Sequence, residues 1–237
     1  MSKKINEMFS RIYKKYDFMD HILSCNVDIF WRKKAVNETL KGLKSHKSYK
    51  LLDVASGTGD LAIEIKRAAV KKKQGEDIEL DIYAIDSNSD MLNVAINKAK
   101  KMNLPIHFKV GDALAIDFPS DTFDLLTSSF ALRDFDDLEK FIQEANRVLK
   151  KNAKIVLMDM SDPEGKFSKL FFNLYAKIMI LEDSLVDKDA YSFLINSIRS
   201  FDEQRLINIM KNKGFKNIKT AKLCPYVTFL LTAEKSQ

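Results

Sequence analysis

Two short apolar runs of this chain end in residues that could hold a nucleoside. Leu51–Val54 leads into a turn of small residues that contains Gly57 and Gly59, and a later apolar run, 82–85, ends at Asp86. Glycine has no Cβ, so a ligand can lie directly against such a turn. A carboxylate at the tip of the neighbouring strand can accept hydrogen bonds from both hydroxyls of a ribose. The pattern predicts a nucleoside lying across the carboxyl ends of a parallel sheet.

The same turn bears on which nucleoside binds. Dinucleotide-binding turns read G-x-G-x-x-G, and Ala62 occupies the third position here, as the variant form of the pattern allows. Asp60, however, places a negative charge where a diphosphate would need bare N–H groups. S-adenosylmethionine has no phosphate and carries a sulfonium and an amino-acid tail. We therefore predict S-adenosylmethionine as the cofactor, with a dinucleotide as the alternative.

Polar residues near the ends of other expected strands predict further contacts with this cofactor. Asp53 is placed to hold its ammonium group directly or through a water, and Asp86 to accept from its ribose. Asp112 with Ala113 is expected to contact adenine, although Asp112 could instead be only a turn residue. Ser129, at the end of an expected strand, should lie near the transferred methyl group.

Strand and helix patterns alternate between residues 48 and 160, which predicts a doubly wound parallel sheet with helices on both faces. The expected strands are 49–55, 80–85, 106–110, 123–129 and 154–160, and the expected helices are 60–70, 88–102 and 136–149. Gly214 marks the end of a later helix. Two strand-like runs after it, 217–223 and 226–233, are expected to complete the sheet as an antiparallel hairpin.

Two amphipathic helical segments, 3–42 and 166–200, do not belong to this alternation. Each is apolar over much of its circumference, which predicts burial against the protein or against an apolar ligand. Simple core packing is one interpretation, and a lid over an apolar substrate pocket is the other. We expect one domain made of an N-terminal helical cap (1–47), a cofactor-binding core (48–160), a helical lid (161–200) and a C-terminal helix and hairpin (201–237).

Composition narrows the class of protein. The chain has 237 residues, 46% of them hydrophobic, and no apolar run approaches the ~20 residues of a membrane span. The N-terminus does not resemble a secretory signal. Cys25 and Cys224 match no disulfide or metal spacing, and His21, His46 and His107 are scattered, so we expect a cytoplasmic protein without a metal.

Positive charge is concentrated near the N-terminus. Residues 1–50 hold 12 Lys and Arg against 5 Asp and Glu, whereas the net charge of the whole chain is +6. A solvated helix face explains this most simply. Contact with an anionic membrane surface and contact with nucleic acid are the alternatives.

Several motifs together resemble the ubiquinone/menaquinone biosynthesis C-methyltransferases, a family of Rossmann-like methyltransferases, over nearly the whole chain. The generic motifs are Leu52–Asp60, Asp86-Ser87 with Met91-Leu92, Gly111-Asp112-Ala113, and Phe123-Asp124. The motifs that point to the narrower family are the opening segment from Met8-Phe9 through Tyr16–Asp20 to Trp31-Arg32, then Phe130–Asp134, and Tyr191–Leu194 with Ser197-Ile198.

The resemblance implies a seven-stranded, mostly parallel sheet with an antiparallel final strand. It also implies S-adenosylmethionine-dependent methylation of a ring carbon of a lipid polyprenyl quinol, demethylmenaquinol being the expected acceptor. Thr58 joins the cofactor contacts by resemblance, and the candidate contacts also include Ser56, Ser87 and Met91.

The chain departs from the family pattern at several positions, most of them near the expected substrate side. Asn26 replaces a usual glycine, and Asp20 and Asp134 replace usual asparagines. Lys151-Asn152-Ala153 replaces the usual proline-glycine-glycine turn before the fifth strand, and the final hairpin lacks the family's glycines.

Methylation of carbon needs an electron-rich ring, so we expect a residue that favours the phenolate of the quinol. Arg133 is the first candidate for a stabilising cation, with Asp134, or a water that it orients, as the base. Asp134 could equally hold Arg133 in place by a salt bridge. Tyr191 and His21 are weaker candidates.

Other functions stay open at this point. A different small apolar acceptor is the main alternative, and a cofactor-binding scaffold is a minor one. Nucleic-acid methylation fits the basic pI of about 9.1, but Thr127–Phe130 stands where such enzymes carry an Asn/Asp-Pro-Pro-Tyr/Phe motif, so we expect no nucleic-acid partner. Peripheral membrane contact and a homodimer are the remaining options for partners.

Overall fold

The structure, a computed structural model, describes residues 27–44, 47–72, 78–163, 165–166, 168–170, 172–173, 188–223 and 227–236. Most of the predicted N-terminal cap, with His21 and the opening motif except for Trp31-Arg32, lies outside these residues. So do much of the predicted lid and the turn of the final hairpin. Tyr191 belongs to a described helix, but its side chain lies outside the description.

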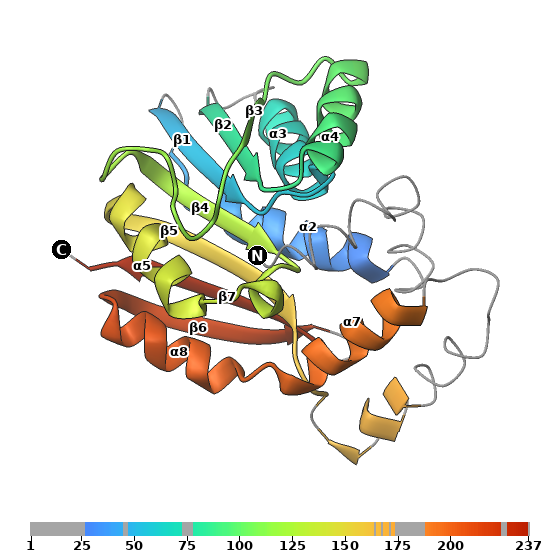
Figure 1. Cartoon of the computed structure of the whole chain (residues 1–237). Coiled ribbons are helices and arrows are strands. Elements are labelled where there is room, and N and C mark those ends of the chain that lie inside the picture. Colours follow the sequence, from blue (N-terminus) through green and yellow to red (C-terminus); the bar gives the residue numbers. More distant parts are fainter. Residues whose placement is uncertain are drawn as a thin grey trace.

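The described residues form a seven-stranded sheet with the strand order β3-β2-β1-β4-β5-β7-β6 (Figure 1). The strands are β1 (Lys47–Val54), β2 (Ile78–Asp86), β3 (His107–Val110), β4 (Phe123–Ser129), β5 (Leu149–Met160), β6 (Phe215–Leu223) and β7 (Thr228–Lys235). The first five strands pair in parallel, and β7 runs antiparallel to both β5 and β6. The predicted doubly wound sheet with an antiparallel final hairpin is confirmed.

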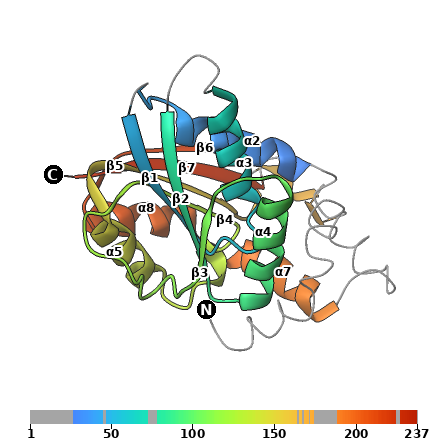
Figure 2. The same cartoon turned by 90° about the horizontal axis from the view of Figure 1, so that it is seen from above.

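Helices cover both faces of this sheet (Figure 2). They are α2 (Val27–Leu40), α3 (Asp60–Lys72), α4 (Ser89–Lys101), α5 (Leu138–Val148), α7 (Lys188–Ser200), α8 (Glu203–Asn212) and the 3-10 turn η1 (Leu132–Asp134). One core joins buried side chains of α2 and α3, such as Trp31 and Ile65, to the strands. The other core joins α5 and α8, through Phe141 and Leu206, to the opposite face.

The start of β5 differs from the prediction. The strand begins at Leu149, directly after α5, and runs through the segment expected to be a turn. Phe123 pairs with Leu149 but Leu125 pairs with Lys154, so the register shifts between them. Asn152 adopts a φ of +59° there, a left-handed conformation that asparagine tolerates better than most residues. The extra residues therefore form a bulge within one strand instead of a separate turn.

Helix α7 packs at the carboxyl end of β5. Its Ile195 and Ile198 are buried with Phe172 and Val227, and Met160 packs against the same cluster. This arrangement places the described part of the predicted lid next to the strand ends. The lid function itself stays a prediction. In the part of the chain that the structure describes, no helix has the length and apolarity needed to cross a membrane.

Gly59 provides a test of how closely the turn after β1 packs. A Cβ at Gly59 would lie 2.8 Å from the Cβ of Ala95 on α4, whereas a Cβ at Gly42 would meet nothing within 4 Å. Both glycines have similar φ values, +82° and +81°. Gly42→Ala should therefore cost only about 1 kcal/mol, for the left-handed backbone. Gly59→Ala should cost about 1–3 kcal/mol more, for overpacking.

The two free energies of unfolding can be compared by urea denaturation monitored by circular dichroism. Equal losses for the two variants would contradict the close approach of this turn to α4.

Candidate functional site

The turn between β1 and α3 is built from alternating left-handed residues. Ala55, Gly57 and Gly59 have φ values of +53°, +54° and +82°. The Gly59 N–H donates to the Ser56 carbonyl at 2.9 Å, and the Ser56 N–H donates to the carbonyl of Ile85 on β2 at 3.0 Å. The sequence indicated the two glycines, but alanine gave no signal that position 55 would share their conformation.

Asp86 ends β2 and fixes this turn. Its Oδ2 accepts from the Gly57 N–H at 2.7 Å, and its Oδ1 accepts from the Asn88 N–H at 2.8 Å. Burial raises the pKa of the Asp86 carboxyl above its usual value, and the backbone hydrogen bonds from Asn88, Gly57 and Ser87 oppose that rise. Each carboxylate oxygen has two lone pairs, so Asp86 can still accept hydrogen bonds from a ligand.

An open cleft lies over the turn and the ends of β2 and β4. Many of the predicted site residues line it together. These are Ser56, Gly57, Thr58, Asp86, Met91, Ser129 and Asp134. Arg32 of α2 and Phe130 line it too, and neither was among the predicted site residues. The pair Trp31-Arg32 in the opening motif was the available signal for Arg32.

Other predicted site residues do not line the cleft. Gly59 packs against α4, Ala113 is buried in one of the cores, and Ser87 follows Asp86 without reaching the lining. Asp112 is exposed, and its Oδ1 accepts from the Leu114 N–H at 2.9 Å. This geometry fits the alternative that Asp112 is a turn residue. Contact of Asp112 with adenine stays a prediction.

Asp53 lies beneath the turn and is 1% exposed. Its Oδ1 accepts from the Thr127 hydroxyl at 2.6 Å, and its Oδ2 has no hydrogen-bond partner among the described residues. Burial is the main cause that raises the pKa of Asp53 to about 7; the Thr127 hydrogen bond opposes it, and the charge of Asp86 adds to it. A buried carboxyl with one oxygen lacking a partner needs a proton or a cation.

The surroundings of Asp60 differ from those expected from the sequence. It contacts Lys98 Nζ at 2.5 Å and Arg32 Nη2 at 3.5 Å, and Arg32 also pairs with Asp28 at 2.5 Å. Two cations therefore balance the charge that would otherwise repel a diphosphate. That argument against a dinucleotide does not hold by itself.

Arg133 and Asp134 lie on η1, directly after β4, but have different surroundings. The Arg133 guanidinium forms an ion pair with the fully buried Asp159 at the end of β5, whose other oxygen accepts from the Arg133 N–H at 3.2 Å. Among the described residues, the ion pair of Arg133 is thus with Asp159. Asp134 acts on Arg133 only through charge there, because Arg133 lowers its pKa. Asp159 was missed, although it ends an apolar run as Asp86 does.

Asp134 lines the cleft, whereas Arg133 does not. It is buried, and its Oδ1 has no hydrogen-bond partner among the described residues. Burial raises the pKa of Asp134 to about 6, while the charge of Arg133 lowers it and that of Asp159 raises it. The cleft therefore holds a carboxyl that can exchange a proton near neutral pH.

The raised pKa of Asp53 predicts how stability depends on pH. Between pH 4 and 7 folded Asp53 keeps a proton that the unfolded chain, with the ordinary value of 3.8, has released. The free energy of unfolding should therefore fall as pH rises through this window, by about 1.4 kcal/mol per unit at most. Asp53→Asn removes that contribution, so the variant should gain stability relative to the parent between pH 5 and pH 8.

Asp117→Asn is the matched control for urea denaturation at the two pH values. Asp117 is exposed, and its pKa is lowered by Lys109, so it is ionised throughout this range in both states. Parallel curves for the parent and Asp53→Asn would show that Asp53 is not protonated in the fold.

Comparison with known proteins agrees with this geometry. The model of the ubiE/COQ5 methyltransferase family matches residues 1–235. A demethylmenaquinone methyltransferase of Bacteroides fragilis is 33% identical over 240 residues, with 99% of this chain and 93% of that protein covered. A ubiquinone/menaquinone biosynthesis C-methyltransferase of Rickettsia massiliae is 32% identical over 220 residues, with 90% and 85% covered.

The fold also matches solved structures. A SAM-dependent methyltransferase from Aquifex aeolicus superposes with a TM-score of 0.59 at 21% identity, covering 86% of this chain and 89% of that one. Sheet order, cleft and sequence thus lead to one assignment: the chain belongs to the ubiE/COQ5 methyltransferase family.

Proposed function

We propose that this protein transfers a methyl group from S-adenosylmethionine to a ring carbon of a lipid polyprenyl quinol of the demethylmenaquinol type. The observation that carries the proposal is the cleft in which Asp86, the glycine turn and the buried Asp134 meet. The names of the relatives from Bacteroides fragilis and Rickettsia massiliae support the acceptor class.

The residues of the cleft fit the adenosyl donor. The turn allows close approach at Gly57, and Asp86 can accept from the ribose hydroxyls. The Asp53 oxygen that has no partner in the described part of the chain would be satisfied by the donor's ammonium group, directly or through a water. We assign Ser56, Thr58, Met91 and Ser129 to its other contacts, with Gly59 and Ser87 shaping the turn and strand end. When bound, the donor supplies an electrophilic methyl group.

Deprotonation of the acceptor is the task left to the protein. A hydroquinone hydroxyl resembles tyrosine, with a pKa of about 10, so ionising it at pH 7 costs about 4 kcal/mol. Asp134 lines the cleft and can take this proton as the general base. Arg133, held by Asp159, favours the charged form of Asp134 and of a phenolate beside it. Tyr191 on α7 stays a weaker candidate.

Apolar surface supports a lipid acceptor. Phe130 lines the cleft, and its ring lies 6.1 Å from that of Trp31. On α2, Ile29 and Phe30 are exposed next to Lys33 and Lys34. Apolar side chains beside lysines suit the surface of an anionic membrane. We propose peripheral contact of a cytoplasmic protein with the membrane that holds its substrate.

A transfer assay tests the function. The protein is incubated with methyl-labelled donor and chemically reduced demethylmenaquinol in detergent, and label is counted in the lipid extract. We expect label to appear with the parent, and Asp86→Ala to lower donor affinity by about 10² because two hydrogen bonds to a charged group are lost.

A panel of other small apolar acceptors is run beside the quinol. Donor binding by the folded protein without label in the quinol would contradict the proposed acceptor, and label in another compound would identify the alternative.

The raised pKa of Asp134 predicts how the rate of the reaction depends on pH. A general base must be deprotonated, so kcat should fall below a pKa of about 6. Asp134→Asn keeps the shape and removes the titration; we expect kcat about 10² lower and no acid limb in this range. Measurement of kcat from pH 5 to 8 checks this. Unchanged kcat and an unchanged limb in the variant would exclude Asp134 as the base.

A further inference from the structure

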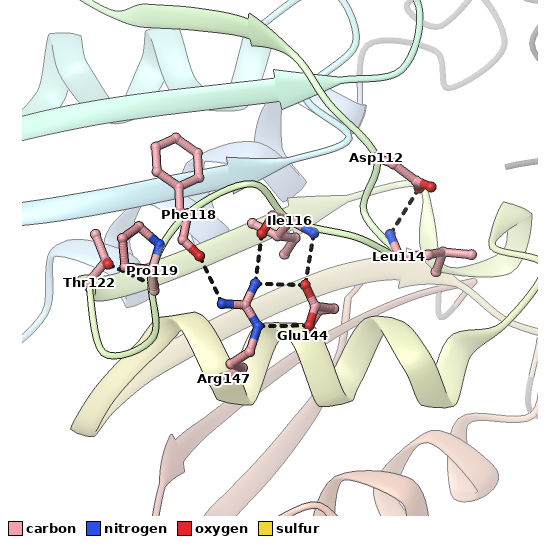
Figure 3. A network of polar contacts seen from close by, with 8 residues as sticks. All are labelled: Asp112, Leu114, Ile116, Phe118, Pro119, Thr122, Glu144 and Arg147. Atoms are coloured by element: carbon pink, nitrogen blue, oxygen red, sulfur yellow. Dashed lines mark hydrogen bonds and ion pairs between the residues drawn. The ribbon is translucent and has the colours of Figure 1, made fainter.

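The loop between β3 and β4 carries Asp112 near its start and is held further along by α5 (Figure 3). The Gly111 N–H donates to the Asp86 carbonyl at 2.9 Å, which places the start of the loop beside the end of β2. Asp112 then closes a small turn, because its carbonyl accepts from the Ala115 N–H at 3.1 Å. The carboxylate that would meet adenine is therefore only a few residues from the next fixed point, Ile116.

Glu144 and Arg147 of α5 form that fixed point. Arg147 Nε and Nη2 each donate to Glu144 at 2.8 Å, which locks the guanidinium in a bidentate ion pair. The same guanidinium donates to the carbonyls of Ile116 at 2.7 Å and Phe118 at 2.8 Å. Glu144 accepts in turn from the Ile116 N–H at 2.8 Å. Figure 3 shows both side chains rising from α5 to the loop backbone.

This arrangement differs from an ordinary helical ion pair. Glu64 and Arg67 have the same i,i+3 spacing on α3, contact each other at 2.6 Å and are both more than 40% exposed. Glu144 and Arg147 are 18% and 34% exposed. Their hydrogen-bonding groups are directed to the backbone of a loop that is distant from them in sequence. The pair on α5 therefore fixes a loop, whereas the pair on α3 lies on the surface.

We propose that Glu144 and Arg147 are positioning residues for donor specificity: they hold the loop so that the Asp112 carboxylate reads the exocyclic amine of the donor's adenine. The inference rests on the proposed function, because it takes adenine to lie beside Asp112. Neither residue touches the donor. They act by keeping Asp112 at a fixed place relative to Asp86, which accepts from the ribose of the same molecule.

The test compares two ligands that differ at the group being read. S-adenosylhomocysteine carries the exocyclic amine, and S-inosylhomocysteine carries a carbonyl oxygen there, which a carboxylate disfavours. Isothermal titration gives the ratio of the two Kd values for each variant. One hydrogen bond to a charged group predicts a ratio of about 10 to 10² in the parent. Arg147→Met should bring the two Kd values to within about threefold of each other.

Five further variants, one of them a double variant, complete the design. Arg67→Met, the matched control, should keep the ratio of the parent. Asp112→Ala removes the reading group and should abolish discrimination, and adding Arg147→Met to it should change the ratio no further. Arg147→Lys keeps the positive charge but offers a single nitrogen as donor, so its ratio of Kd values should lie between those of the parent and of Arg147→Met. Glu144→Gln provides a milder disruption of the same clamp if circular dichroism shows that Arg147→Met does not fold.

The outcomes separate this inference from the proposed function. Failure of the folded parent to bind either compound would contradict the donor site itself. Binding without discrimination by the parent would overturn only the reading role of Asp112 and its clamp. Equal weakening of both ligands by Arg147→Met, with the ratio unchanged, would assign the pair a merely structural role and overturn the inference.

Discussion

The hydrogen bond from the Gly57 N–H to Asp86 joins the two strands on which the site depends. A glycine turn after β1 and a carboxylate at the end of β2 are separate features of the sequence, and this bond makes them one surface. The Ser56 N–H to Ile85 bond and the Gly111 N–H to Asp86 bond continue the connection along the strand ends. The carboxyl ends of strands β1, β2 and β3 are therefore held in place by Asp86 and its neighbours.

Buried carboxyl groups set the electrostatics around that surface. Asp53 and Asp134 each have a raised pKa because burial disfavours their charged forms. Asp159 is equally buried but is paired with Arg133. Acids held this way in a cleft are characteristic of sites that bind cations or move protons. A donor with a sulfonium and an ammonium group matches this charge pattern.

Local pattern was enough to predict the order of the elements and the residues of the turn. Strand β5 was the exception, because its bulge depends on pairing with β4, a contact distant in sequence. The cleft residues Ser56, Gly57 and Asp86 were predicted because they lie at the end of β2 or in the turn directly after β1. Asp159 and Arg147 were missed because their roles come from partners on other elements, which neither composition nor spacing reveals. Pairing of Asp60 with Lys98 was hidden for the same reason.

The strand order has a consequence for how the protein acquires its sheet. β7 is the last described strand along the chain, yet it lies inside the sheet between β5 and β6. During synthesis β5 therefore remains an open edge until the final strand has left the ribosome, and β6 has no partner before then. An open edge of this kind invites pairing with other chains. The interval between synthesis of β5 and arrival of β7 is thus when the nascent chain most needs protection from aggregation.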